Sequence, residues 1–323
     1  MQVSERIFQQ DSADAISPVK RALMLKTFPA FTGLEPSSLA LLASICKERY
    51  FKKGSVMLKP GVPVLRFYLI VEGSVQMYAG GIATKEFGPR SAIGGLAALT
   101  RDPEGAHTVA LEDVLALEMD RDDMQDVFED SFSVLLGVLS ALALTLRDMQ
   151  RQMGGSAAIA ASRKLKAIKA DQKLSLVERM FFLRRTTNFG DARIEALADI
   201  ALEAEQVHYA KGEQIWKTDE TADYSIMVLN GVVECRPEEA NNFAFGAGHV
   251  LGDLDALAWE PRWYSAYAKE EVDALVLKRS STFDVLEDNT DMAMQLLRNF
   301  ASGITAFIAK MTAMKRALDP EED

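Results

Sequence analysis

The sequence predicts an α+β protein, mainly β, made of two tandem copies of one small β-barrel or sandwich with flanking helices. Three observations predict this fold. The 323-residue chain is long enough for two domains and matches itself over most of its length. Each copy contains short β-like runs that are separated by glycines. Each copy also ends in a long segment with helical apolar periodicity.

The internal match holds one register without a gap. Phe51–Gly54 aligns with Tyr209–Gly212, an offset of 209 − 51 = 158 residues. The same offset relates further pairs along the chain, namely Val19 and Val177, Gly73 and Gly231, Phe87 and Phe245, Gly94 and Gly252, Pro103 and Pro261. We therefore interpret the chain as a tandem duplication of one domain.

Each copy shows the same order of elements. Two helical segments come first, at 16–27 and 36–46 in the first copy and at 174–185 and 191–203 in the second. Strands are expected at 64–71, 74–78, 108–110 and 114–119, and again at 224–229, 232–235, 265–268 and 274–278. This order predicts a β core preceded by two helices in each copy.

A long helix with an apolar stripe is expected at the end of each copy. The stripe residues recur at spacings of three and four: Leu135, Leu139, Leu142, Leu146, Met149 and Met153, then Ala293, Leu297, Phe300, Ile304, Phe307, Met311, Met314 and Leu318. Each helix could pack on its own barrel. Alternatively, the stripes form a helix–helix seam, either between the two copies or between the subunits of a homodimer.

These elements divide the chain into five parts. We expect an N-terminal tail at 1–15, a first domain at 16–153, a linker at 154–173, a second domain at 174–318 and an acidic tail at 319–323.

Composition excludes several classes of function. The net charge of −11 argues against nucleic-acid binding, which depends on clustered Lys and Arg. Two cysteines, Cys46 and Cys235, form no CxxC pair, so disulfides and thiolate metal sites are not expected. The polar N-terminus lacks a signal sequence, and the longest uncharged run, 131–146, is short for a bilayer. We therefore expect a cytoplasmic protein without membrane insertion.

The most informative stretch in each copy is a glycine turn followed by a short helix and a proline. It reads GGLAALTRDPEGAHT from Gly94 to Thr108 and GDLDALAWEPRWYSA from Gly252 to Ala266. Free backbone N–H groups at such a turn suit an anion. The second copy places Arg262, a charge suited to phosphate, after its proline, whereas the first has Glu104 there.

Helices, a glycine-rich barrel, this turn motif and a final long helix together resemble the cyclic nucleotide-binding domain of catabolite activator proteins and protein kinase A regulatory subunits. The resemblance covers nearly the whole chain in two copies and implies a jelly-roll β-barrel in each. In the family, a phosphate-binding cassette reads roughly G-E-L-A-L-L-x-x-x-P-R-x-A. Its glutamate holds the ribose 2′-hydroxyl, and its arginine pairs with the cyclic phosphate.

By this resemblance, the second copy retains part of a nucleotide site for cAMP or cGMP. The matching positions are Gly252, Asp253, Leu254, Arg262 and Ser265. Four residues depart from the pattern: Asp253 is shorter than glutamate, Asp255 adds negative charge, and Trp263 and Tyr264 are bulky. The alternatives are that Arg262 pairs with a carboxylate such as Glu260, that Asp253 caps the helix, and that the aromatic residues are local packing.

The first copy departs further from the family. Gly95 replaces the sugar-binding glutamate, and Glu104 replaces the arginine. Losing a charge-assisted hydrogen bond to phosphate lowers the affinity roughly tenfold or more. An anion at the position of the arginine lowers the affinity further. We expect no cyclic nucleotide in the first domain.

No catalytic or metal site is expected. The three histidines, His107, His208 and His249, match no metal-ligand spacing, and no catalytic motif occurs. After the second long helix only a short acidic segment remains, so a helix-turn-helix domain is not expected either.

Two functional hypotheses remain. In the first, the chain is a non-enzymatic signalling protein whose second domain binds a cyclic nucleotide and transmits the change through its long helix to a protein partner. In the second, it is a ligand-independent pseudo-receptor that acts as a protein-interaction scaffold. Retention of Pro261 and Arg262 favours the first, and Asp255 and Tyr264 favour the second.

Overall fold

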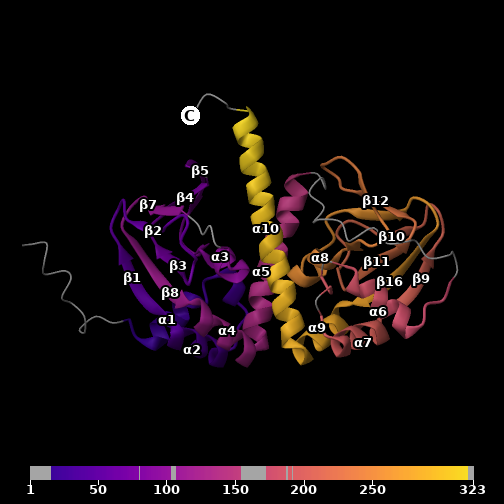
Figure 1. Cartoon of the computed structure of the whole chain (residues 1–323), viewed down its shortest axis with the longest axis horizontal. Helices are drawn as coiled ribbons and strands as arrows, with labels where there is room; N and C mark the ends of the chain where they lie inside the picture. The colour runs from indigo at the N-terminus through magenta and orange to yellow at the C-terminus, as the bar shows by residue number, and fades with distance from the viewer. Residues whose placement is uncertain are drawn as a thin grey trace, which may run out of the picture. The chain divides into compact units, whose positions relative to one another are not determined.

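The computed structural model describes residues 16–79, 81–102, 107–153, 172–186, 188–190 and 192–318, with side chains up to 313. The chain forms two compact units (Figure 1). Residues 138–311 make up the second unit, and the chain before 138 and after 311 makes up the first. The predicted tails at 1–15 and 319–323 and most of the linker at 154–173 lie outside the described residues.

The first unit contains two four-stranded antiparallel sheets, which follow two N-terminal helices along the chain. The helices are α1 (Pro18–Leu25), the 3₁₀ turn η1 (Pro29–Phe31), α2 (Pro36–Ile45), α3 (Gly95–Thr100) and α4 (Arg121–Asp130). One sheet has the order β1 (Lys47–Phe51), β8 (Val114–Asp120), β3 (Arg66–Glu72), β6 (Ala92–Ile93). The other has the order β2 (Val56–Leu58), β7 (His107–Ala110), β4 (Val75–Ala79), β5 (Ile82–Phe87).

The second unit repeats this architecture. Its helices are α6 (Leu176–Arg184), α7 (Ile194–Glu203), α8 (Asp253–Ala258) and α9 (Arg279–Asp288). One sheet has the order β14 (Val250–Leu251), β11 (Tyr224–Asn230), β16 (Val272–Lys278), β9 (Glu205–Tyr209). The other has the order β10 (Gln214–Trp216), β15 (Ser265–Ala268), β12 (Val232–Arg236), β13 (Phe243–Gly246).

The structure confirms the predicted fold of two jelly-roll domains. Corresponding strands begin at positions that differ by the predicted offset, as in β3 and β11 or β8 and β16. The inner faces of both sheets form the core of the second unit, where Trp216, Ile226, Val233 and Ala274 are buried. Both cysteines are free and buried.

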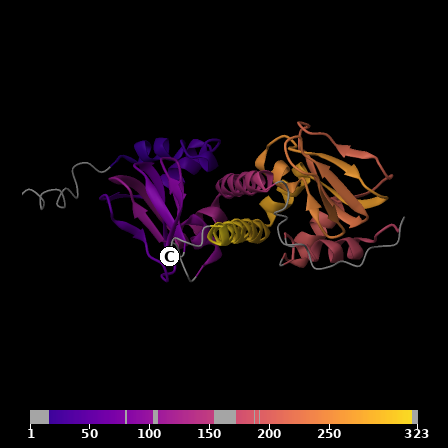
Figure 2. The ribbon, with the colours of Figure 1, turned by 90° about the horizontal axis from the view of Figure 1, so that it is seen from above.

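The two long helices are α5 (Phe132–Gln152) and α10 (Thr290–Leu318). Within the second unit they run side by side (Figures 1 and 2), and Gly303 of α10 faces the side chain of Leu146. The stripe residues Leu139, Leu146, Leu297 and Phe300 are buried. The predicted seam therefore joins the long helices of the two copies.

Two features of the long helices differ from the expectations. The part of α5 from Val138 onward groups with the second unit, although it belongs by sequence to the first copy. Helix α5 extends past the uncharged run and is, by length and composition alone, apolar enough to cross a membrane, a test that core helices of soluble proteins also pass. The side chains of Met314 and Leu318 lie outside the described residues.

Gly231 illustrates how a turn residue is fixed by the fold. It adopts a left-handed φ of 82°, and a Cβ atom placed there would overlap the carbonyl oxygen of Glu271. Gly212 has a similar φ of 86° but faces open space.

We predict that Gly231→Ala lowers the free energy of unfolding by about 3 kcal/mol, whereas the control Gly212→Ala lowers it by about 1 kcal/mol. Both variants add left-handed strain, but only the first also displaces neighbouring backbone. Denaturant unfolding of the two variants checks this, and equal losses would show that the close contact at Gly231 is unimportant.

Candidate functional site

The second cassette, defined here as Gly252–Ala266, is held between two strands. Strand β14 ends at Leu251, and Gly252 turns the chain with a left-handed φ of 74° so that α8 can begin at Asp253. Helix α8 ends at Ala258 and is followed by Trp259, which has a left-handed φ of 57° that is uncommon for a bulky residue. Beyond it, the chain passes Pro261 and Arg262 and enters β15.

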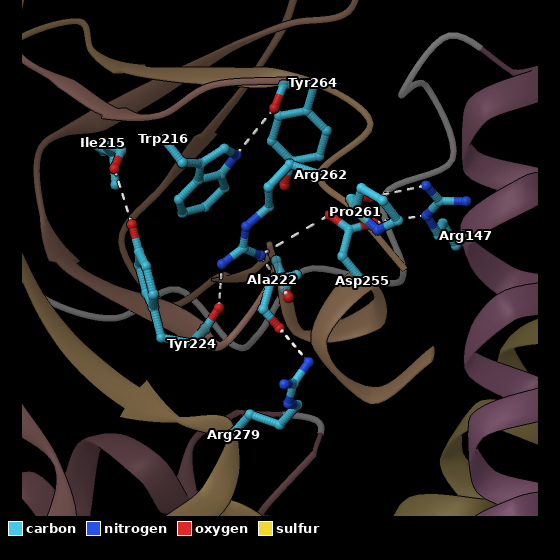
Figure 3. Close-up of polar contacts among 11 residues, drawn as sticks. Arg147, Ile215, Trp216, Ala222, Tyr224, Asp255, Pro261, Arg262, Tyr264 and Arg279 are labelled. Atoms are coloured by element: carbon cyan, nitrogen blue, oxygen red, sulfur yellow. Dashed lines mark hydrogen bonds and ion pairs between the residues drawn. The ribbon is translucent and has the colours of Figure 1, made fainter. Parts of the chain in front are cut away.

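Arg262 is buried in the protein interior, with 1% of its surface exposed. Its Nη1 donates to the carbonyl oxygen of Gly252 at 2.9 Å, and its Nη2 donates to the carbonyl oxygen of Tyr224. The guanidinium carbon lies 4.3 Å from the ring centre of Trp216 and 5.0 Å from that of Tyr224 (Figure 3). Main-chain oxygens and aromatic faces therefore occupy the surfaces of this cation.

Gly252 is required by this position of Arg262. A Cβ atom at residue 252 would overlap Nη1 of Arg262. The equivalent glycine of the first unit, Gly94, also has a positive φ, but a Cβ atom there would meet the aliphatic side chains of Leu58 and Val64. The same backbone turn therefore rests on a guanidinium group in one copy and on apolar groups in the other.

Asp255, in the first turn of α8, lies between two arginines. Its Oδ1 accepts a hydrogen bond from Nε of Arg147 at 2.8 Å, and its Oδ2 lies 4.0 Å from Nη1 of Arg262 (Figure 3). Arg147 comes from α5 and also donates from Nη2 to the carbonyl oxygen of Pro261 at 3.0 Å. Only 1% of Asp255 is exposed. A carboxylate of the chain thus accompanies the two buried cations.

The other residues predicted for this site make contacts within the protein. Asp253 is half-buried and accepts a hydrogen bond from Nδ2 of Asn188 at 2.9 Å. Leu254 is buried. The Oγ atom of Ser265 accepts a hydrogen bond from the backbone N–H of Thr218 at 3.0 Å.

Trp263 and Tyr264 are buried in the core of the second unit. The ring of Trp263 stacks on Phe243 with centroids 5.5 Å apart, and Tyr264 packs edge-on against the same ring. Trp216 donates from Nε1 to the carbonyl oxygen of Tyr264 at 3.0 Å. Trp259 differs, because it is 58% exposed and stacks with Arg279 at 4.1 Å.

A hollow that is partly open to solvent lies beside the cassette. Its wall includes the carboxylates Asp253 and Asp255, the aromatic side chains of Trp263 and Tyr264, and Gln150 of α5. No lysine or arginine is among the described residues that line it.

Comparison with known proteins identifies the family. The model of the cyclic nucleotide-binding domain family matches residues 48–131 and 206–289, together just over half of the chain. The chain belongs to the cyclic nucleotide-binding domain family. Each match spans most of the strands of one copy and its cassette.

Individual relatives are more distant. The chain is 28% identical over 122 residues to a CRP-like cAMP-activated global transcriptional regulator of Mycobacterium tuberculosis, covering 36% of this chain and 54% of the relative. It is 35% identical over 106 residues to acetyltransferase Pat of Mycolicibacterium smegmatis, covering 32% of each. The chain thus spans about half or less of the length of these relatives.

Among solved structures, the cAMP complex of the regulatory domain of Toxoplasma gondii PKA is similar over 90% of this chain and 98% of that chain. The sequence identity is 17% and the TM-score is 0.33.

The structure brings the predicted cassette residues together, but with different neighbours from those expected. Arg262 is neither a surface arginine paired with Glu260 nor exposed to the hollow. The described counterpart of the cassette in the first domain contains Gly95, whereas Pro103 and Glu104 lie outside the described residues. Among the described residues, no group of three His, Cys, Asp or Glu side chains could hold a metal ion.

Sequence reasoning missed Arg147, Asn188 and Tyr224 as neighbours of the cassette. The sequence contained an indication for Arg147, because this residue directly follows the long uncharged run of the predicted helix. A charge on the buried part of an amphipathic helix needs a partner. Asp255, a second acidic residue in a short helix of otherwise apolar residues after Asp253, had the same need.

Burial raises the pKa of the Asp253 and Asp255 carboxyl groups to about 6. The hydrogen bond and charge of Arg147 oppose this rise in the pKa of Asp255 but do not outweigh burial. In the unfolded chain an aspartate has a pKa of about 4. The folded protein therefore binds more protons than the unfolded chain between about pH 4 and pH 6, and this contribution to stability is lost as the pH rises.

We predict that Asp253→Asn removes the part of this pH dependence that Asp253 contributes. The measurement is the free energy of unfolding between pH 4 and pH 8 for both proteins. The wild type should lose stability relative to the variant as the pH rises from about 4 to about 6, because only the wild type must ionise the buried carboxyl of Asp253. A difference that stays constant with pH, or that changes in the opposite direction, would contradict the prediction.

Proposed function

We propose that this chain is a non-enzymatic, cytoplasmic regulatory protein whose second cyclic nucleotide-binding domain keeps its cassette folded without a cyclic nucleotide. It acts as a pseudo-receptor that presents its surfaces to protein partners. The observation that carries the proposal is the burial of Arg262, whose donors are directed at the carbonyl oxygens of Gly252 and Tyr224. An arginine in this arrangement has to leave two acceptors and two aromatic faces before it can bind a phosphate.

The shape and charge of the hollow support the same proposal. In the family pattern an alanine stands at the second position after the arginine, but here that position is Tyr264, which packs in the core together with Trp263. A nucleotide would also bring its negative charge toward the carboxylates of Asp253 and Asp255. Like charges brought together in a partly buried site oppose binding.

The surfaces available to a protein partner include apolar groups outside the cassette. Trp259 is 58% exposed at the end of α8, and Met311 is 43% exposed on α10. Exposed aromatic and methionine side chains are enriched at protein interfaces. The proposal includes a homodimer through the long helices. The apolar stripe of α10 is more exposed to solvent at Met311 than nearer the start of the helix.

We predict that cAMP and cGMP leave the thermal unfolding midpoint of the purified protein unchanged up to millimolar concentration. A ligand present at 100 times its Kd would stabilise the fold by about 2.7 kcal/mol and raise the midpoint by about 5 °C or more. The absence of such a shift is expected because Arg262 is engaged inside the protein.

The matched variants for this experiment are Arg262→Ala and Arg279→Ala. Both remove an arginine that contacts an aromatic ring, but only Arg262 lies in the cassette. A nucleotide-induced shift that persists in Arg279→Ala and is lost in Arg262→Ala would overturn the proposal and favour a nucleotide receptor.

A further inference from the structure

The two arginines beside Asp255 come from parts of the chain that are far apart in sequence. Arg147 lies on α5, and Arg262 lies in the loop before β15. Their side chains are 8% and 0% exposed, and that of Asp255 is 2% exposed. Two cations and one anion are therefore packed together with little access to water.

This cluster has more buried cations than buried anions. Asp255 is the one carboxylate within 4.0 Å of both arginines in the described part of the chain. Asp148, 3.6 Å from Nη1 of Arg147, is exposed, and Asp253 is hydrogen-bonded to Asn188 and interacts with Arg262 only through its charge, without an ion pair. Because a buried cation without a counter-ion is strongly destabilising, the two arginines require the carboxylate of Asp255.

Arg147 contacts both ends of the cassette helix. Its Nε binds Asp255 in the first turn of α8, and its Nη2 binds the carbonyl oxygen of Pro261 beyond the last turn. Oδ2 of Asp255 has no hydrogen-bond partner among the described residues and is turned toward Arg262 (Figure 3). One carboxylate thus links α5, α8 and the buried arginine.

We propose that Asp255 is a built-in anionic ligand. Its carboxylate fills a small-anion site made by Arg147 and Arg262, and in doing so it fastens α5 to the cassette without any bound molecule. This inference rests on the proposed function and names the group that replaces an external anion. When the carboxylate is removed, the two guanidinium groups form a site for an anion of the size of formate.

Chemical rescue tests the proposal. Asp255→Ala removes the carboxylate and should lower the thermal unfolding midpoint of the full chain by about 10 °C, because two buried cations lose their counter-ion. Sodium formate should then raise the midpoint of this variant by several degrees more than that of the wild type. Sodium chloride at equal ionic strength and the uncharged isostere formamide should not reproduce the gain.

Two further variants make the rescue specific. Leu286→Ala destabilises the same unit through a fully buried side chain outside the cassette, and formate should give it no more stability than the wild type. In Arg147→Ala/Asp255→Ala the gain from formate should shrink, since one of the two cations is absent. Equal gains in Leu286→Ala and Asp255→Ala, or no gain in either, would overturn the proposal.

Asp255→Asn keeps the side-chain volume and serves if Asp255→Ala does not fold. In this variant, amide hydrogen exchange over residues 143–152 of α5 should be at least several-fold faster than in the wild type, because the charge that holds Arg147 is gone. Unchanged hydrogen exchange in α5 would contradict the proposal that Asp255 holds this helix against the cassette. Nucleotide binding by the wild type would overturn the proposed function instead, so the two failures are distinguishable.

Discussion

The second domain depends on one constraint, which is the burial of two guanidinium groups beside a single carboxylate. Arg262 can remain inside the core only because carbonyl oxygens, aromatic faces and Asp255 surround it. Asp255 in turn requires Arg147, which brings α5 against the cassette. Trp216 packs against this cluster, Gly252 lies directly beside Arg262, and Arg147 connects the long helix to the cassette.

The two domains share one backbone fold, but different side chains lie beneath the glycine turn in each. The turn at Gly94 and the turn at Gly252 have the same left-handed conformation, and each is followed by a six-residue helix. Beneath the first turn lie Leu58 and Val64, whose counterparts in the second copy are Trp216 and Ala222. In the second copy the indole ring of Trp216 carries a guanidinium group against its face, whereas in the first copy aliphatic side chains lie beneath the turn.

Much of the fold could be predicted from the sequence because it depends on local and repeated patterns. The glycines, the alternating strands and the constant offset identified two copies of one jelly-roll domain. The apolar stripes identified the long helices, but periodicity alone could not show which surface each stripe faces. Leu146 and Gly303 are separated by the whole second barrel in sequence, so their contact is a property of tertiary packing.

The sequence located the cassette along the chain, but it could not give the contacts that the cassette residues make in the fold. The motif located Gly252, Asp253 and Arg262, and it indicated that Asp255 adds negative charge. It could not show that Arg262 points into the core, since that depends on Trp216 and Tyr224 from other strands. It also could not pair Asp255 with Arg147, 108 residues away.

We propose that a carboxylate of the chain, and no external phosphate, lies between Arg147 and Arg262. This can be tested with a crystal structure of the protein grown with millimolar cAMP. We expect electron density for the Asp255 side chain within hydrogen-bonding distance of Arg147 and no nucleotide in the hollow beside the cassette. A cyclic phosphate bound to the guanidinium group of Arg262, with Asp255 displaced, would contradict it.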